Sequence, residues 1–415
     1  MTSVALEATT GRRRLRERTH AARPAVEVQQ PRVDALTGLR IVAATFVFGS
    51  HLATPEFVAE PVRTFLAAGY NGVTLFFVLS GFVLAWNYAD RLARPSVRGL
   101  WSFAVARVAR IYPLYLVALL WAAAPALVTH TLPEHSWLHV VALQTWHPDV
   151  FFAYALNGPG WSIGVEFFLY ACFPLVLLAV LPLRRHPGLL VAVAVLAVLV
   201  VLAAAWWFTA TGRGALAPAD PASAHRWLYR NPATRLGDFV VGVSLALLLR
   251  VARPRRRAGL VAQWLGVTAL AVLMLQPSLL NSAWSWDAAY LAPAALLIWG
   301  LASDTRSALA RLLASRPMVL AGEASFAFYL LHVPLMRQLT AGPVDRWNGW
   351  LFTSTLVFGM ILLVAVGAHI VVEKPAQRWI RRTLDRRRPP ARPEPRDLLP
   401  GFVADEAPAA TGGTR

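Results

Sequence analysis

The sequence predicts an all-α integral membrane protein, with about ten transmembrane helices in one bundle. Of its 415 residues, 57% are hydrophobic and only 15% are charged. Soluble proteins carry about 25% charged residues. The apolar residues also fall in blocks of about 17–23, the length that crosses a bilayer core of about 30 Å as a helix. Arginine-rich segments separate many of these blocks.

Ten apolar blocks are long enough to be transmembrane spans. We expect them at about residues 34–52, 70–89, 111–129, 161–182, 188–209, 236–250, 258–277, 287–302, 320–338 and 351–372.

The distribution of arginine predicts the orientation. The chain carries a net charge of +18, concentrated near both ends and in the segments 91–110, 184–185, 250–257 and 305–317. The alternate connections carry fewer arginines, so the positive-inside rule places both termini in the cytoplasm. Because the basic clusters lie between apolar blocks, they predict contact with a lipid bilayer and no nucleic-acid partner. The dominance of arginine over lysine favours a bacterial cell (inner or plasma) membrane.

Composition divides the chain into one membrane domain and two tails. We expect disordered tails at 1–32 and 383–415, which are rich in Arg, Pro, Ala and Gly, and a membrane domain at 33–382. The single Cys172 excludes an intramolecular disulfide, and no Cys/His spacing predicts a metal site. The connection 130–160 is rich in Trp and His, which suggests that it folds back over the spans.

Arg40 and His51 are the polar residues of the first span, "LTGLRIVAATFVFGSH". They are eleven positions apart, almost three helical turns, so both project from one face and lie about 16 Å apart along the axis. Charged groups inside a bilayer are costly and therefore mark functional paths. The alternative is an arginine that extends to the interface and a histidine at the outer boundary.

A second polar group follows a turn signal in "NGPGWSIGVEFFLYACFP". Trp161 suits a membrane interface, and Ser162 is placed to cap the helix. Glu166 lies one turn further, where a carboxylate could orient a histidine and stabilise its protonated form. The alternative is a structural ion pair with a loop arginine.

Arg107 and Arg110 lie three residues apart at the predicted cytoplasmic end of the third span. This spacing puts both guanidinium groups on one helical face, where they can bind phosphate through forked hydrogen bonds. Anchoring by the positive-inside rule produces the same pattern, so the pair alone does not decide between the two.

Three further residues are candidates for the same site. His332 stands at middle-to-outer depth in the ninth span, near the layer of His51 and Glu166. Asn71 and Thr74 lie at the outer end of the second span, where they could add hydrogen bonds. The adjacent Ser80 and Gly81 resemble a small-residue packing face. His369 has no polar neighbours in its motif and is interpreted as structural.

These segments together resemble the membrane acyltransferase-3 family. The similar segments, in order, are "LTGLRIVAATFVFGSH", "NGVTLFFVLSGFVLAW", "RVARIYPLYLV", "PGWSIGVEFFLYACFP", "RLGDFVVGVSLA", "SFAFYLLHVPL" and "VEKPAQRWI". They run from about residue 34 to 380. In "RLGDFVVG" an Asp stands where the family pattern has Glu.

The resemblance implies a ten-helix enzyme that takes an acyl group, usually acetyl, from cytoplasmic acyl-CoA and binds no other cofactor. Family acceptors are carbohydrate hydroxyls of surface polysaccharides, peptidoglycan, glycolipids or macrolides. His51 matches the catalytic histidine and Glu166 the acidic residue of the Trp-Ser motif. Arg40, Arg107 and Arg110 match the family's arginines. Nothing after residue 383 predicts a fused extracytoplasmic domain, so a second transfer would need a separate protein.

The sequence leaves two questions of function open. Acyl transfer could proceed directly, with His51 as general base, or through an acyl-histidine. A proton-coupled transporter or flippase also uses buried His, Glu and Arg, but no internal repeat or matched pair of broken spans favours one.

Overall fold

The computed structural model describes residues 33–252, 254–339 and 346–384. Every regular element in these ranges is helical. Of the predicted tails 1–32 and 383–415, residues 1–32 and 385–415 lie outside the described residues, so their predicted disorder stays untested. Residues 383 and 384, assigned to the C-terminal tail, instead form the last residues of a helix.

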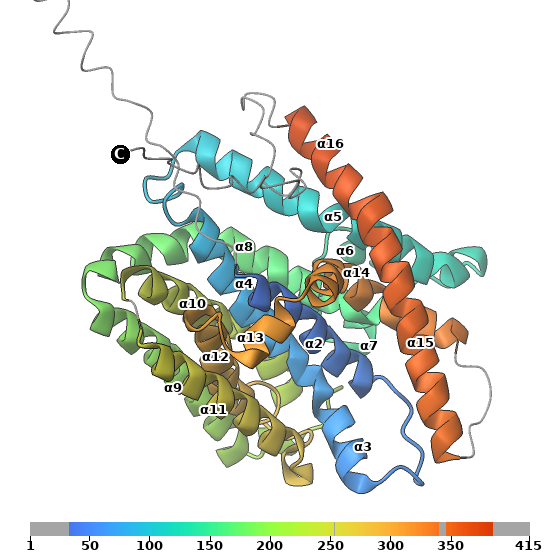
Figure 1. Ribbon diagram of the computed structural model, residues 1–415. Coiled ribbons are helices and arrows are strands. Elements are labelled where there is room, and N and C mark those ends of the chain that lie inside the picture. Colours follow the sequence, from blue (N-terminus) through green and yellow to red (C-terminus); the bar gives the residue numbers. More distant parts are fainter. Residues whose placement is uncertain (1–32, 253, 340–345, 385–415) are drawn as a thin grey trace, which may run out of the picture.

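Each of the ten predicted spans overlaps one long helix (Figure 1). These helices are α2 (Asp34–Ser50), α4 (Gly72–Tyr88), α5 (Val97–Val128), α8 (Trp161–Val180), α9 (Pro187–Ala210), α10 (Pro232–Val251), α11 (Arg256–Met274), α12 (Ala288–Ser303), α14 (Arg316–Leu339) and α15 (Trp347–Ala368). Within the described ranges, eight helical stretches are long and apolar enough to cross a membrane. Helices α2 and α12 are shorter, with 17 and 16 residues. The predicted all-α membrane fold is confirmed.

Short elements connect these helices. They are α3 (Glu60–Ala67), η1 (Ala68–Asn71), α6 (Trp137–Val140), η2 (Gln144–Trp146), α7 (Val150–Ala153), η3 (Gly158–Gly160), η4 (Leu181–Arg185), η5 (Arg213–Ala215), η6 (His225–Tyr229), η7 (Pro277–Leu279), α13 (Ala308–Leu313), η8 (His369–Glu373) and α16 (Lys374–Leu384). Two of them, η6 and η8, are single π-helical turns.

The predicted start of the third span was wrong. Helix α5 begins at Val97, fourteen residues before the expected position 111, because the side chain of Ser96 caps it by accepting the N–H of Gly99. The segment 91–110, predicted as a connection between spans, is helical from residue 97 onward. Arg107 and Arg110 therefore lie within a helix of 32 residues, about 48 Å long.

Helices α4 and α10 approach each other through glycines. A Cβ built at Gly81 would lie 2.1 Å from the carbonyl oxygen of Phe239, and one built at Gly242 would lie 2.1 Å from that of Val78. Only glycine permits such contact between backbones. The predicted packing role is confirmed for Gly81. Helix α4 thus sits near the centre of the bundle, with α2 against it and α14 packed on α2 (Figure 1).

The connections 130–160 and 210–235 fold over one end of the bundle, as predicted for 130–160. Arg230 is fully buried and donates to the carbonyl oxygens of Thr145, His147 and Pro148 at 2.7–3.1 Å. Next to it, burial and the nearby Arg230 and Arg235 lower the pKa of His225 to about 3. This cap lies at the end of the bundle where α2 ends and α4 begins.

Candidate active site

A cavity of about 1190 Å³ opens between α2, α4, α5, α8, α14 and α16. Along α4 it extends from Val73 to Tyr88, a distance of about 22 Å at 1.5 Å per residue. Small-molecule sites usually enclose about 300–1000 Å³. The cavity is therefore long and large enough for an extended ligand.

Cationic side chains outnumber acidic ones on the cavity wall. The cationic residues are Arg40, Arg91, Arg107, Arg110, Lys374, Arg378 and Arg381, and the acidic residues are Asp34, Asp90, Glu166 and Glu323. With His369 neutral, these seven cations and four anions leave a charge of +3. An anionic ligand is favoured.

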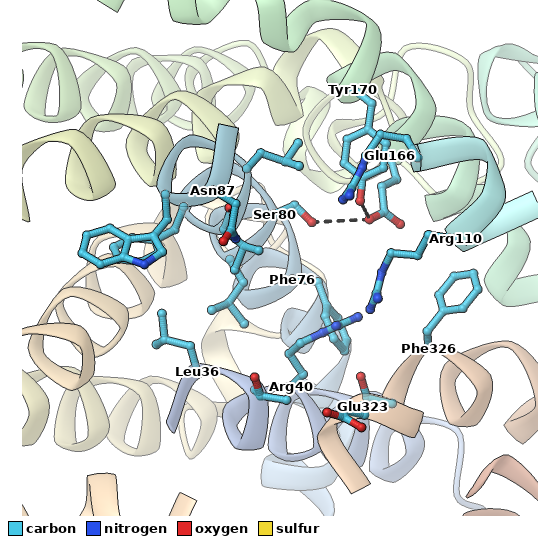
Figure 2. Close-up of a pocket in the computed structure, with 18 of the residues that line it drawn as sticks. Leu36, Arg40, Phe76, Ser80, Asn87, Arg110, Glu166, Tyr170, Glu323 and Phe326 are labelled. Carbon is cyan, nitrogen blue, oxygen red and sulfur yellow. Dashed lines mark hydrogen bonds between the residues drawn. The ribbon is translucent and has the colours of Figure 1, made fainter. Parts of the chain in front are cut away.

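Arg40 of α2 and Arg110 of α5 extend into the cavity from opposite walls, with their guanidinium groups toward each other (Figure 2). Within the described parts of the chain, neither side chain makes a hydrogen bond or an ion pair. Two like charges that face each other without an anion between them are unfavourable. An anion bound between them would remove this repulsion.

Glu166 of α8 also lines the cavity, but its hydrogen-bond partners are not the two arginines. It accepts hydrogen bonds from the hydroxyl of Tyr170, one turn along α8, and from Ser80 of α4 at 3.4 Å (Figure 2). The structure does not bring Glu166 to His51, because Glu166 faces the cavity while His51 lies beyond its deep end. Ser80, expected in a packing face, points into the cavity instead.

Among the described residues, Arg107 has one hydrogen-bond partner. Its Nη2 donates to the hydroxyl of Tyr88 at 2.8 Å, and its guanidinium carbon lies 5.0 Å from the centre of the Tyr88 ring. The other nitrogens of Arg107 make no hydrogen bond that the described residues supply. Arg107 is therefore held over the cavity by Tyr88, and the rings of Phe103 and Tyr170 also lie within 6 Å of its guanidinium carbon, at 5.9 and 5.8 Å.

His51 pairs with His332 of α14. The Nδ1 of His51 lies 2.8 Å from the carbonyl oxygen of Val47 and 3.4 Å from the Nε2 of His332. The Nδ1 of His332 lies 2.6 Å from the carbonyl oxygen of Tyr329. A carbonyl oxygen only accepts, so each neutral ring carries its proton on Nδ1. The Nε2 of His51 is then unprotonated and available as a base.

The cavity ends about one helical turn from this pair. The ring of Tyr329 lines the cavity, contacts the ring of Phe76 at a centroid distance of 5.9 Å, and lies 5.8 Å from the ring of His332. Val73, at the deep end of the cavity, follows Gly72, which packs on Ala43 and Val47 of α2. His332 is fully buried, whereas His51 is exposed at the end of α2.

The other predicted site residues divide between the cavity and its surroundings. Ser162 lines the cavity but does not cap α8; it is the second helical residue and donates to the carbonyl of Pro159. Trp161 is buried against Tyr229. Asn71 donates to the carbonyl of Ala68, and its buried Oδ1 has no partner among the described residues.

Two polar clusters were not predicted as such. Arg235 is fully buried and forms ion pairs with Asp238 and Asp287, the latter also bonded to Thr74. The Arg-x-x-Asp spacing in α10 was the available signal. His369, expected to lack polar neighbours, contacts Glu373 at 2.9 Å at the cavity edge. In the described ranges, no three His, Cys, Asp or Glu residues could hold a metal ion.

Comparison with known proteins identifies the chain's relatives. Acyltransferase MdmB of Streptomyces mycarofaciens is 35% identical over 402 residues, which cover 92% of this chain and 98% of that protein. Protein 2 in the picA locus of Rhizobium radiobacter is 44% identical over 84 residues, 20% of this chain and 40% of that protein. No solved structure matches. The acyltransferase domain family matches residues 33–370, so this chain belongs to the membrane acyltransferase-3 family and is an acyltransferase that transfers groups other than amino-acyl groups.

Proposed function

We propose that the protein transfers an acyl group, usually acetyl, from cytoplasmic acyl-CoA to a hydroxyl of a carbohydrate-containing acceptor. The acceptor classes are those of the family: a surface polysaccharide, peptidoglycan, a glycolipid or a macrolide. The protein would lie in the bacterial plasma membrane with both termini in the cytoplasm. Acyl-CoA is a co-substrate in this proposal, and no other cofactor is required.

The observation that carries the donor proposal is the pair of facing arginines. Arg40 and Arg110 extend into the cavity without partners among the described residues. Arginine binds phosphate through paired, charge-assisted hydrogen bonds. We therefore assign the pyrophosphate of acyl-CoA to the space between Arg40 and Arg110. The cavity mouth lies where α2 begins and α16 follows α15, the side expected to face the cytoplasm.

The length of the pantetheine arm of acyl-CoA fits the separation between Arg40 and His51. Arg40 and His51 lie about 16 Å apart along α2. The pantetheine arm has about twelve bonds between the phosphate oxygen and the sulfur, equivalent to four residues of extended chain, or about 14 Å. The thioester would thus reach the histidine pair once Phe76 and Tyr329 separate at the deep end.

The proposed chemistry begins at the Nε2 of His51. This nitrogen removes the proton of the acceptor hydroxyl as the oxygen attacks the thioester carbonyl. The bond from carbonyl carbon to sulfur then breaks, and the CoA thiolate receives the proton from His51. His332 is the positioning residue, because its Nε2 faces the Nδ1–H of His51 and stabilises the imidazolium. An acyl-histidine at the same Nε2 is the alternative order of steps.

Glu166 receives a different role from the one first expected. It shares the cavity with Arg40 and Arg110, so its carboxylate partly compensates their charge and is fixed in place by Tyr170 and Ser80. We propose that Glu166 positions the arginines for the donor and does not orient His51.

The test is release of the CoA thiol by purified protein in the presence of acceptor. His51→Ala is expected to lower the rate about 10²–10⁴-fold, the contribution of a general base, while acetyl-CoA still binds. The matched control is His186→Ala, an exposed histidine distant from the cavity lining, which should leave the rate unchanged. Full activity of His51→Ala would refute the catalytic assignment.

A further inference from the structure

Helix α16 places a row of cations along the mouth of the cavity. Lys374, Arg378 and Arg381 line the cavity, and their spacing of four and then three residues puts them on one helical face. Lys374 is paired with Glu323 at 3.4 Å. Arg378 makes no hydrogen bond or ion pair with any residue that the structure describes.

Three features show that this row belongs to the cavity and not only to the lipid interface. Helix α16 packs along α5 (Figure 1). Its apolar Trp379 is 68% exposed and points away from the cavity lining, as a membrane-facing side chain would. Arg382, next to Arg381, is exposed and does not line the cavity. Helix α16 therefore has one face whose cations line the cavity and another face, with Trp379 and Arg382, that does not.

Arg378 and Arg381 lie nearer the mouth of the cavity than the facing pair Arg40 and Arg110. The two sets therefore form two levels along the cavity. Arg40 lies within electrostatic reach of Arg110 and of Glu166, which is bonded to Ser80 of α4. Arg381 lies within electrostatic reach of Tyr88, at the end of α4. These two α4 residues are eight positions apart, or about 12 Å. A ligand that satisfies both levels needs two separate phosphate groups.

We propose that Arg378 and Arg381 of α16 bind the 3′-phosphate of the donor's adenosine and make the enzyme selective for donors that carry it. This inference rests on the proposed acyl-CoA donor. In CoA, about six bonds join the pyrophosphate to the 3′-phosphate, or about 7 Å when extended. Long arginine side chains cover the rest of the separation between the two levels. Acyl donors that lack the 3′-phosphate would contact Arg40 and Arg110 but not Arg378 and Arg381.

The experiment compares acetyl-CoA with 3′-dephospho-acetyl-CoA as donors, with protein in phosphatidylcholine nanodiscs. For the parent protein, kcat/KM should be about 10–100-fold higher with acetyl-CoA, as expected for hydrogen bonds to a charged group. The double variant Arg378→Ala/Arg381→Ala should bring this ratio close to one, without lowering activity on the dephospho donor. The retained activity also shows that the variant is folded. Arg382→Ala is the matched control and should keep the parent ratio.

Three results would overturn the inference. One is an equal preference of the parent protein for both donors. Another is a double variant that loses activity equally on both. The third is an effect that appears only when phosphatidylglycerol is added to the nanodiscs, which would assign the row to lipid headgroups. Failure of the parent protein to release thiol from either donor would instead refute the proposed function.

Discussion

Two pairs of arginines in this protein have opposite surroundings. Arg230 and Arg235 are fully buried, and most of their guanidinium nitrogens donate to protein oxygens. Arg235 donates to the carbonyls of Tyr229 and Trp286 and pairs with two aspartates. Arg40 and Arg110 extend into a cavity, without a protein partner in the described ranges.

The comparison separates arginines whose partners belong to the protein from arginines whose proposed partner is the acyl donor. A buried charge is tolerated only when it is paired and hydrogen-bonded, and the protein supplies every partner of Arg235. Arg40 and Arg110 have access to water in the cavity and therefore need no protein partner to remain charged. Their partners would come with the substrate.

The largest expected effect is on folding, at Arg235. Arg235→Met leaves Asp238 and Asp287 buried without a cation. Removal of one partner from a buried ion pair costs about 3–5 kcal/mol, so the variant should lose thermal stability in detergent and accumulate poorly in membranes. Adding Asp287→Asn should recover part of this loss. An Arg235→Met variant with the parent melting temperature would show that the cluster does not hold the fold.

The next effect is on activity, at Arg40. Arg40→Gln should keep or slightly raise the melting temperature, because it removes the repulsion from Arg110. It should lower kcat/KM for the donor about 10–100-fold, since hydrogen bonds between charged groups contribute about 1.5–3 kcal/mol. Melting curves and thiol-release kinetics on the same sample separate the two effects. A loss of stability with unchanged kinetics would place Arg40 with the structural arginines.

The helices and the cavity arginines could be predicted because both follow from local patterns. Apolar blocks set the positions of all ten long helices. Arg107 and Arg110 share a face through their spacing alone, and the shared side of the membrane brings them near Arg40. The start of α5 could not be predicted from hydropathy, because a cap at Ser96 extends the helix through a basic segment.

Contacts between distant helices could not be predicted in the same way. Depth in the bilayer, counted from residue numbers, placed His51, Glu166 and His332 in neighbouring layers. It does not give the direction in which each side chain projects around its helix axis. The structure pairs His51 with His332 and turns Glu166 to the cavity. Asp287 was missed because it lies 52 residues from Arg235 in the chain.

The smallest expected effect concerns Arg107. It lines the cavity, as Arg40 and Arg110 do, but it also has a protein hydrogen-bond partner, as Arg235 does. One of its nitrogens donates to Tyr88, and the Tyr88 ring lies under its guanidinium group. Tyr88→Phe keeps the ring, and with it the cation–π contact, but removes the hydrogen bond. We expect KM for acetyl-CoA to rise about 3–10-fold, the equivalent of about 1 kcal/mol, with kcat unchanged.

Tyr88→Leu removes both the hydroxyl and the ring and therefore sharpens this test. If the ring contributes to holding Arg107 over the cavity, KM should rise further than in Tyr88→Phe. Arg107→Gln sets the upper limit, because it removes the cation itself. A KM for Tyr88→Phe as high as that of Arg107→Gln would mean that the hydrogen bond alone positions the guanidinium. An unchanged KM in both Tyr88 variants would mean that Tyr88 does not position Arg107, and would assign that role to the rings of Phe103 and Tyr170, 5.9 and 5.8 Å from its guanidinium carbon, or to the ligand.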